Sequence, residues 1–222
     1  MSSPIAFIIG SGGNVGHHTA VALKSKGYRV ALGSRNPAVE QIQRDGFFPV
    51  TVDAQSAESI KAAFAKVNAE LGRPNAVIFN AATFAAAPTP ADPLTLPIES
   101  LMQQTVFGVS VFAAAQEAVA FRADVHKDAL KTFIVTGNAL PWLSGPAADP
   151  KWLGTNIQKV VMWRLVDILR TAYSKENIRF YFATIVDRTT GGIPNPLSDF
   201  FTSGPQHGQV YLDLVTRTDQ AD

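Results

Sequence analysis

Lys159 and Thr155 stand four positions apart in the stretch LGTNIQKVVMWRLV, residues 153–166, and both carry groups that could take part in proton transfer. A catalytic acid works best when its pKa lies near the working pH. The hydroxyl of a threonine has a much higher pKa than the phenol of a tyrosine, so Thr155 cannot serve as a comparable acid. The stretch therefore holds half of a proton-transfer pair, and its use depends on what the rest of the chain places beside it.

Glycines at the first predicted strand–helix junction form a second chemical feature. The segment IIGSGGNVGHHTAVALKSKG, residues 8–27, has the spacing G-x-x-x-N-x-G with an extra glycine pair inside. Glycines let the backbone approach a pyrophosphate, whose charge then meets exposed amides and the positive end of a helix. A tight turn without a ligand is the alternative. The residues predicted to bind a dinucleotide cofactor at this loop are Gly10, Ser11, Gly12, Asn14, Val15 and Gly16.

The sequence GSRN, residues 33–36, follows the second predicted strand. A site that prefers NAD usually offers a carboxylate to the ribose 2′-hydroxyl at this place. Here Ser34 and Arg35 supply a hydroxyl and a fixed cation suited to a 2′-phosphate, with Asn36 next to them. The pattern predicts NADP(H) rather than NAD, although Arg35 could also be a solvated loop cation.

Composition excludes several classes of function. A net charge of +1, with acidic and basic residues interspersed, gives no basic face for nucleic acid. The chain has no cysteine, and its four histidines lack metal-ligand spacing, so we expect no bound metal. The apolar run PIAFIIG is too short to span a membrane and reads as a strand. We expect no membrane partner and a cytoplasmic location.

Predicted strands alternate with helical segments along most of the 222 residues. This alternation predicts an α/β fold in one domain spanning 1–222: a doubly wound parallel sheet between two helical layers, with ligands at the carboxyl ends of the strands. Segments 81–97 and 188–205 follow predicted strands and are placed to line a ligand crevice, or are plain loops. The predicted strands are 5–9, 28–32, 48–52, 76–79, 132–135, 180–186 and 209–214, and the predicted helices begin at 36–37, 56, 98 and 155.

The order of these motifs resembles the short-chain dehydrogenase/reductase family over residues 4–186, and less surely over a last strand at GQVYLDLV. The resemblance rests on the glycine loop, GSRN, VDA at 52–54, FNAA at 79–82 and the distant Lys159. It implies that Asp53 and Ala54 lie against the adenine of the cofactor. It also implies that Asn80, Ala81 and Ala82 stand for the Asn-Ala-Gly of the family.

The family's active site, as the resemblance implies it, uses a tyrosine as proton donor, a lysine four residues later, a serine after the fifth strand and an asparagine on the fourth helix. Lys159 fits the lysine, and Thr155 replaces the tyrosine. Asn138 or Ala139 falls at the serine, depending on register. Helix 98–121 contains no asparagine and has Phe107 near the expected place. The cofactor half of the site is thus kept while the reacting end is rebuilt.

We therefore predict an NADP(H)-dependent oxidoreductase with an atypical active site, acting on a small organic substrate such as an imine, enone or quinone-like compound. The predicted catalytic residues are Lys159, which would bind ribose hydroxyls, Asn138, which would offer an amide hydrogen bond, and Thr155. Structural alternatives are a surface lysine and a turn asparagine. Further pocket candidates, which could also be plain packing or solvated charges, are Trp142, Asp149, Lys151, Trp152 and Asp187.

Two other functions fit the same residues. One is a non-redox protein that senses NADP or acts as a scaffold, and the other is a cyclase or isomerase that reuses the cavity. The long apolar helices 98–121 and 155–174 resemble those through which family members associate. They predict a homodimer or homotetramer.

Overall fold

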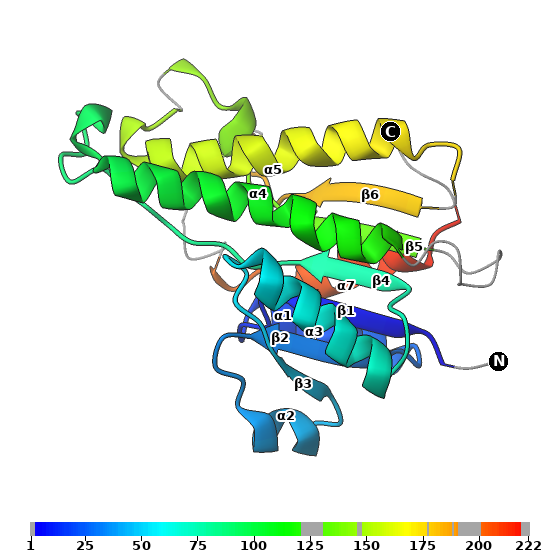
Figure 1. The fold of residues 1–222 in the computed structure, drawn as a ribbon. Coiled ribbons are helices and arrows are strands. Elements are labelled where there is room, and N and C mark those ends of the chain that lie inside the picture. Colours follow the sequence, from blue (N-terminus) through cyan, green and yellow to red (C-terminus); the bar gives the residue numbers. More distant parts are fainter. Residues whose placement is uncertain are drawn as a thin grey trace.

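The protein is described by a computed structural model that covers residues 3–120, 131–145, 148–176, 178–187, 189–190 and 201–218. Six parallel strands form one sheet in the order β3-β2-β1-β4-β5-β6 (Figure 1). The prediction of a doubly wound α/β fold is confirmed. The strands are β1 (Ile5–Ile9), β2 (Arg29–Ser34), β3 (Phe48–Thr51), β4 (Ala76–Phe79), β5 (Lys131–Thr136) and β6 (Ile178–Ala183).

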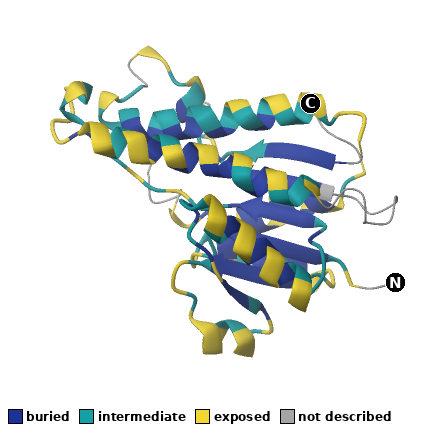
Figure 2. Cartoon of the chain, viewed as in Figure 1, coloured by how far each residue is buried: buried dark blue, intermediate teal, exposed yellow. Residues whose placement is uncertain are grey.

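Successive side chains of each strand point to opposite faces of the sheet, and helices cover both faces. Ile5, Phe7 and Ile9 enter the core beneath α3 (Ala57–Glu70), α4 (Ile98–Ala120) and α5 (Leu153–Ala172). Ala6 and Ile8 enter the opposite core, beneath α1 (Val15–Ser25) and α7 (Gly204–Thr216). Figure 2 shows the result: the strands are buried along most of their length, and the long helices are buried on one side and exposed on the other.

Helix α3 forms where its capping residues predict it. The Ser56 hydroxyl accepts a hydrogen bond from the backbone N–H of Ser59 at 3.1 Å and so caps the first turn. Gly72 takes a positive φ of 106° just after the last turn, which glycine adopts at little cost. Between them Ile60, Phe64 and Val67 are buried at helical spacing.

Helix α2 (Val39–Arg44) begins later than Asn36 and Pro37 predict. Val39 is 46 % exposed, while Ile42 packs partly against the core. The helix has six residues, which is less than two turns, so few of its side chains can face the core. Single helical turns in the described residues include η1 (Pro93–Thr95), η3 (Leu140–Trp142) and η5 (Pro150–Trp152).

The prediction of a last strand at 209–214 is wrong, because these residues lie in α7. Over so short a stretch, the apolar residues of GQVYLDLV fit both the two-residue period of a strand and the 3.6-residue period of a helix. The buried positions are His207, Gly208, Tyr211, Leu212 and Val215, which follow the helical period once 204–208 are included. Segment 188–205, predicted as a substrate-side loop, lies largely outside the described residues, and its end forms the start of α7.

Helices α1 and α7 approach closely through glycine. A Cβ added to Gly208 would lie 2.7 Å from the backbone oxygen of His18. One added to Gly204 would lie 2.5 Å from Oδ1 of Asn14, at the start of α1. Backbone oxygens cannot move aside as a flexible side chain could. The α1–α7 packing therefore requires glycine at 208.

Gly208→Ala tests this packing. Within a helix, alanine is ordinarily better than glycine by about 1 kcal/mol. Here the added methyl group overpacks the α1–α7 contact, and such overpacking costs about 1–3 kcal/mol. We expect the urea midpoint of unfolding to fall, while Gln209→Ala, at an exposed position of the same helix, leaves it nearly unchanged. A higher midpoint for Gly208→Ala would contradict the packing.

Candidate active site

Two adjoining cavities lie at the carboxyl ends of β1 and β4, where the strand order reverses. The first has a volume of about 360 Å³ and the second about 310 Å³, and Gly12, Asn80 and Ala82 line both. Ligands of doubly wound sheets bind at this reversal. The sequence-predicted residues that line the first cavity are Gly10, Ser11, Gly12, Ser34, Arg35, Asp53, Ala54, Asn80, Ala81 and Ala82. Those that line the second are Gly12, Asn14, Val15, Asn80, Ala82, Asn138 and Lys159.

Gly16, Asn36 and Thr155 line neither of these two cavities. Gly16 is buried at the start of α1, where an added Cβ would lie 2.7 Å from the oxygen of Gly10. Asn36 is exposed beyond the end of β2. The structure thus brings most of the predicted site residues together around one crevice and leaves these three beside it.

The glycine loop has two crowded positions and two open ones. Gly10 takes a φ of 97°, and an added Cβ would lie 2.4 Å from the nitrogen of Ala81. The Asn80 side chain donates from Nδ2 to the Gly10 oxygen at 2.7 Å. At Gly12 and Gly13 an added Cβ would meet nothing within 4 Å. The loop is therefore fixed at its base and presents bare backbone toward both cavities, as a diphosphate site needs.

The turn after β2 presents a cation to the first cavity. Ser34 is half-buried, and its oxygen accepts a hydrogen bond from Val52 N at 2.9 Å, which fixes the backbone. Arg35 is exposed and lines the cavity. Among the residues that the structure describes, none forms an ion pair with its guanidinium. Arg35 is therefore available to an anionic ligand.

Asp53 is held in place at the rim of the same cavity. Its Oδ1 accepts from Gln55 N at 3.0 Å, and its backbone N donates to Ser59 Oγ at 2.9 Å. Ala54 beside it is buried and lines the cavity. Phe107, the α4 residue near the place expected for an asparagine, closes the cavity with its ring 6.5 Å from that of Phe79.

Lys159 is the charged group at the inner end of the second cavity. Its side chain is buried, with the residue only 4 % exposed, and Nζ donates to the backbone oxygen of Thr136 at 2.9 Å. Burial lowers the pKa of the ammonium from 10.5 to about 8, because desolvation penalises the charged form. The structural alternative of a surface lysine is therefore excluded.

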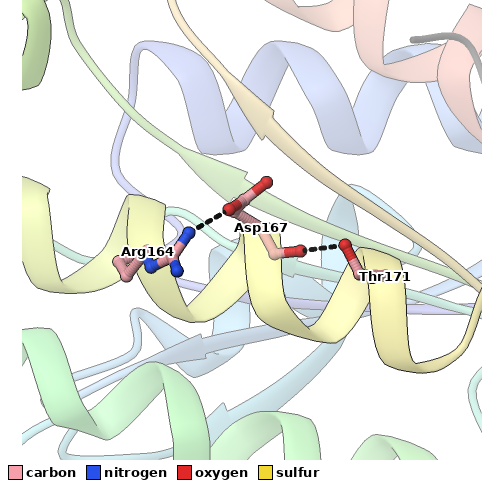
Figure 3. Close-up of polar contacts among 3 residues, drawn as sticks. All are labelled: Arg164, Asp167 and Thr171. Carbon is pink, nitrogen blue, oxygen red and sulfur yellow. Dashed lines mark hydrogen bonds and ion pairs between the residues drawn. The ribbon is translucent and has the colours of Figure 1, made fainter.

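The opposite face of α5 carries its solvated polar groups. Figure 3 shows Arg164 paired with Asp167, with Nη1 and Oδ2 2.5 Å apart, and the Thr171 hydroxyl donating to the Asp167 backbone oxygen at 3.1 Å. The buried face carries Thr155, Gln158, Lys159, Met162 and Val166. The period of α5 thus directs Lys159 into the protein.

Tyr211 reaches the same region from α7, on the other face of the sheet. Its hydroxyl donates to Thr136 Oγ1 at 2.9 Å. The ring is fully buried, and burial raises the pKa of the phenol above its usual value. Because Tyr211 lines neither cavity of the crevice and stays protonated, it supports Thr136 and donates no proton into the crevice. The sequence reading missed Tyr211 because it assigned the segment to a strand.

Thr155 is bonded to the backbone of another segment. Its Oγ1 accepts from Ala85 N at 3.1 Å and lies 3.4 Å from Ala85 O, to which it can donate. The residue is 1 % exposed. The hydroxyl at the position expected for the tyrosine therefore faces away from both cavities and serves as a structural contact.

Residues 83–87, which we call the strap, contact α5 at alternate positions. Gln158 Nε2 donates to the oxygen of Thr83 at 3.3 Å, Thr155 bonds Ala85 on both sides, and Ala87 N donates to the oxygen of Lys151 at 2.8 Å. Exposure alternates in step, with 83, 85 and 87 turned inward and 84 and 86 outward. The strap belongs to segment 81–97, so part of the predicted substrate-side loop has a fixed extended conformation.

Two buried glutamines support the strap, and sequence reasoning missed both. Gln158 Nε2 also donates to Oε1 of Gln104 on α4 at 2.8 Å, and Gln104 is almost fully buried. Helix α4 lacks the family's asparagine yet carries this amide at the α4–α5 contact. Its signal was a polar residue on the otherwise apolar face of a helix.

Asn138 combines its two predicted roles. Its Oδ1 accepts from Leu140 N at 3.1 Å, which forms a turn, and the residue also lines the second cavity. Ala139 is buried and lines neither cavity of the crevice. Of these two residues, only Asn138 lines the crevice.

The other pocket candidates lie outside both cavities of the crevice. Trp142 packs on Trp163 and Phe182 and lines a different cavity of about 360 Å³. Asp149 pairs with Lys151 at 3.0 Å, and this hydrogen bond lowers the pKa of the carboxyl. Asp187 is half-buried, and hydrogen bonds from Thr190 lower its pKa, so both carboxylates stay ionised.

Metal and membrane features can be stated for the described ranges. Within them, no three His, Asp or Glu side chains gather in a way that could hold a metal ion. No helix in the same ranges has the length and hydrophobicity needed to cross a bilayer.

Comparison with known proteins gives one consistent family. Residues 4–127 match the short chain dehydrogenase family. The short chain dehydrogenase/reductase dmxR12 of Cryptosporiopsis sp. (strain 8999) is 28 % identical over 228 aligned residues, which cover 96 % of this chain and 87 % of that protein.

Solved structures share the fold at lower identity. The NADPH-dependent 3-quinuclidinone reductase of Rhodotorula rubra superposes with a TM-score of 0.76 at 21 % identity, covering 99 % of this chain and 88 % of that one. A short-chain type dehydrogenase/reductase of Mycobacterium marinum gives a TM-score of 0.76 at 19 % identity, with coverages of 96 % and 87 %. With more than half of its length matched, this chain belongs to the short-chain dehydrogenase family of oxidoreductases.

Proposed function

We propose that this protein is an NADP(H)-dependent oxidoreductase whose substrate end departs from the usual pattern of its family. The observation that carries the proposal is the crevice, because it places the bare backbone of the glycine loop, Arg35 and Lys159 around two adjoining cavities. A crevice at the strand reversal with a phosphate loop at its centre fits a dinucleotide.

Each part of the crevice fits one part of the cofactor. The open glycines of the loop would take the diphosphate, and Ala54 would contact the adenine beside Asp53. Arg35 would hold the 2′-phosphate through charge-assisted hydrogen bonds. The Lys159 ammonium has donors beyond the one given to Thr136, and they would bind the ribose hydroxyls. The bound nucleotide would supply or accept the hydride.

The reacting end supports a substrate that needs little acid catalysis. Loss of a positioned general acid costs about 10²–10⁴ in rate. Thr155 is bonded to Ala85, and the polar side chains that line the second cavity include Lys159 and the amide of Asn138. An iminium carbon needs no proton when it is reduced, and an enone or quinone-like acceptor can take its proton from water afterwards. We propose substrates of these kinds.

Binding and turnover test the proposal separately. Calorimetry with NADPH and NADH measures binding, and loss of NADPH absorbance with ketone, enone, quinone and imine panels measures turnover. We expect NADPH to bind and to be oxidised by conjugated or imine acceptors. Binding without turnover across all panels would favour a cofactor sensor or scaffold. Absence of any binding would leave only a cyclase or isomerase that uses the cavity.

An exposed apolar stripe on α4 supports self-association. Its side chains recur every three or four residues along the helix, and each is at least 43 % exposed. A stripe of this kind usually marks a protein interface. We propose that α4 and the adjacent α5 form a homodimer or homotetramer interface. The stripe consists of Ile98, Met102, Val106, Val109 and Phe112.

Arg35→Ala tests nucleotide preference. The variant loses one or two charged hydrogen bonds to the 2′-phosphate, so the Kd for NADPH should rise roughly ten- to hundredfold, at about 1.5–3 kcal/mol for such bonds. The Kd for NADH should change little. Arg44→Ala, which removes an exposed arginine of α2 that lines neither cavity, is the matched control. Equal losses for both nucleotides would show that Arg35 does not read the 2′-phosphate.

Lys159→Met separates binding from stability. The folded-state pKa of about 8 lies below the ordinary 10.5, so the unfolded chain holds more protons between these values. The free energy of unfolding of the wild type should therefore rise from pH 8 to 10.5. The variant should lack this rise and be more stable at pH 7, by up to about 3 kcal/mol. Its NADPH affinity should fall.

The control for this comparison is Lys61→Met, at an exposed lysine on α3. It should keep both the pH dependence and the nucleotide affinity of the wild type. Unchanged NADPH affinity in Lys159→Met would refute the proposed role of Lys159, whatever its effect on stability.

Met102→Asp combined with Val109→Asp tests the interface. Two carboxylates in an apolar interface carry a large desolvation cost, so the variant should be monomeric by light scattering while the wild type is a dimer or tetramer. Val39→Asp, at an exposed valine of α2, should keep the wild-type assembly. A monomeric wild type at tens of micromolar would disprove the interface.

A further inference from the structure

An exposed phenylalanine stands at the wall of the second cavity. Phe84 is 59 % exposed and lines this cavity together with Lys159, Asn138 and the glycine loop. A large apolar ring in water at a cavity wall is a surface that a ligand can cover. No other aromatic side chain lines this cavity among the described residues.

The backbone of Phe84 is fixed on both sides. The oxygen of Thr83 accepts from Gln158, and Ala85 is bonded through both its N–H and its carbonyl to Thr155. Successive side chains of an extended segment point to opposite sides. Because 83 and 85 face α5, Phe84 must face away from it, and the strap cannot turn the ring inward without breaking these hydrogen bonds.

A second ring supports the first. Trp152 meets Phe84 edge to face, with ring centroids 6.4 Å apart at 69°. The Lys151 ammonium lies 5.2 Å from the Trp152 ring centre and pairs with Asp149 at 3.0 Å. Each of these contacts restricts the next side chain. The Phe84 ring is therefore held in place before a ligand arrives, which reduces the entropy lost on binding.

The rest of the cavity wall consists mostly of small residues and polar side chains. Gly12, Gly13, Gly137 and Ala82 contribute little beyond backbone, whereas the polar side chains belong to Asn14, Asn80, Thr136, Asn138 and Lys159. A ligand that fits this lining has a flat apolar body against Phe84 and a polar atom toward Asn138 and Lys159. A puckered ring of the same size would contact Phe84 over a smaller area.

We propose that Phe84, supported by Trp152 and held by the strap, is the specificity-determining residue that selects flat, conjugated ring systems as substrates. The inference rests on the proposed function, because the nicotinamide of a bound NADP(H) would lie on the glycine side of the same cavity. It narrows the substrates from conjugated acceptors in general to planar cyclic ones. Thr155 then has a role without proton transfer: it positions the ring through the strap.

The test compares 2-naphthol with trans-2-decalol, which share a carbon skeleton and a hydroxyl but differ in planarity. Neither alcohol can be reduced by NADPH, so calorimetry with and without NADPH measures binding alone. The wild type should bind 2-naphthol several-fold more tightly than the decalol. Phe84→Leu keeps an apolar side chain and should weaken 2-naphthol binding by about three- to tenfold, as expected for one ring contact, and remove the preference.

Two variants of Thr155 test the strap. Thr155→Val removes the hydrogen bonds to Ala85 and should also weaken 2-naphthol binding, although the side chain lies outside the cavity. Thr155→Ser keeps both hydrogen bonds and should restore wild-type affinity. Trp142→Leu removes an exposed ring that lines a different cavity and should have no effect.

The outcomes separate this inference from the proposed function. If NADPH binds but Phe84→Leu leaves the affinity for 2-naphthol unchanged, or if the wild type has no preference for the planar alcohol, the selection by Phe84 is overturned. If NADPH fails to bind while Phe84→Leu still removes the preference, the oxidoreductase proposal fails, and the selection of planar ligands by Phe84 is supported.

Discussion

The side-chain amide of Asn80 donates to the Gly10 oxygen across the gap between the ends of β1 and β4, and both cavities of the crevice border on it. This hydrogen bond joins the two strands between which the sheet order reverses. It holds Gly10 so close to Ala81 that no Cβ fits, and the glycine loop consequently begins at a fixed point. In the proposed function the diphosphate would lie at this loop, with Arg35 on one side and Lys159 on the other.

Two residues one turn apart on α5 have opposite roles. Lys159 remains buried at a cost in stability, with a lowered pKa, and its ammonium faces the cavity. Perturbed pKa values of this kind cluster at functional sites, and in the proposed function the hydroxyl oxygens of a bound ribose would offset the cost. Thr155, in contrast, accepts a hydrogen bond from the backbone N–H of Ala85 in the strap. In the proposed function the two residues have separate roles: Lys159 would bind the ligand, and Thr155 fixes the strap.

The sequence predicts the sheet and the loop because both depend on local signals. Buried strands alternate with helices, and Gly10 and Gly16 mark a turn that no other residue fits. The strap could not be predicted, because Ala85 and Thr155 lie 70 positions apart and the contact uses backbone atoms that carry no sequence signal. Residues 209–214 were misassigned because a short apolar run fits both the strand and the helix period, and the helical period becomes clear only when residues 204–208 are included.

A crystal structure of the complex with NADP⁺ tests the central claim most directly, which is that the cofactor half of the site is kept while the hydroxyl at 155 is structural. The account predicts the 2′-phosphate within hydrogen-bond distance of Arg35 and the nicotinamide ribose at Lys159 Nζ, with Thr155 still bonded to Ala85. A nucleotide bound elsewhere would contradict the account. So would a Thr155 hydroxyl turned toward the nicotinamide.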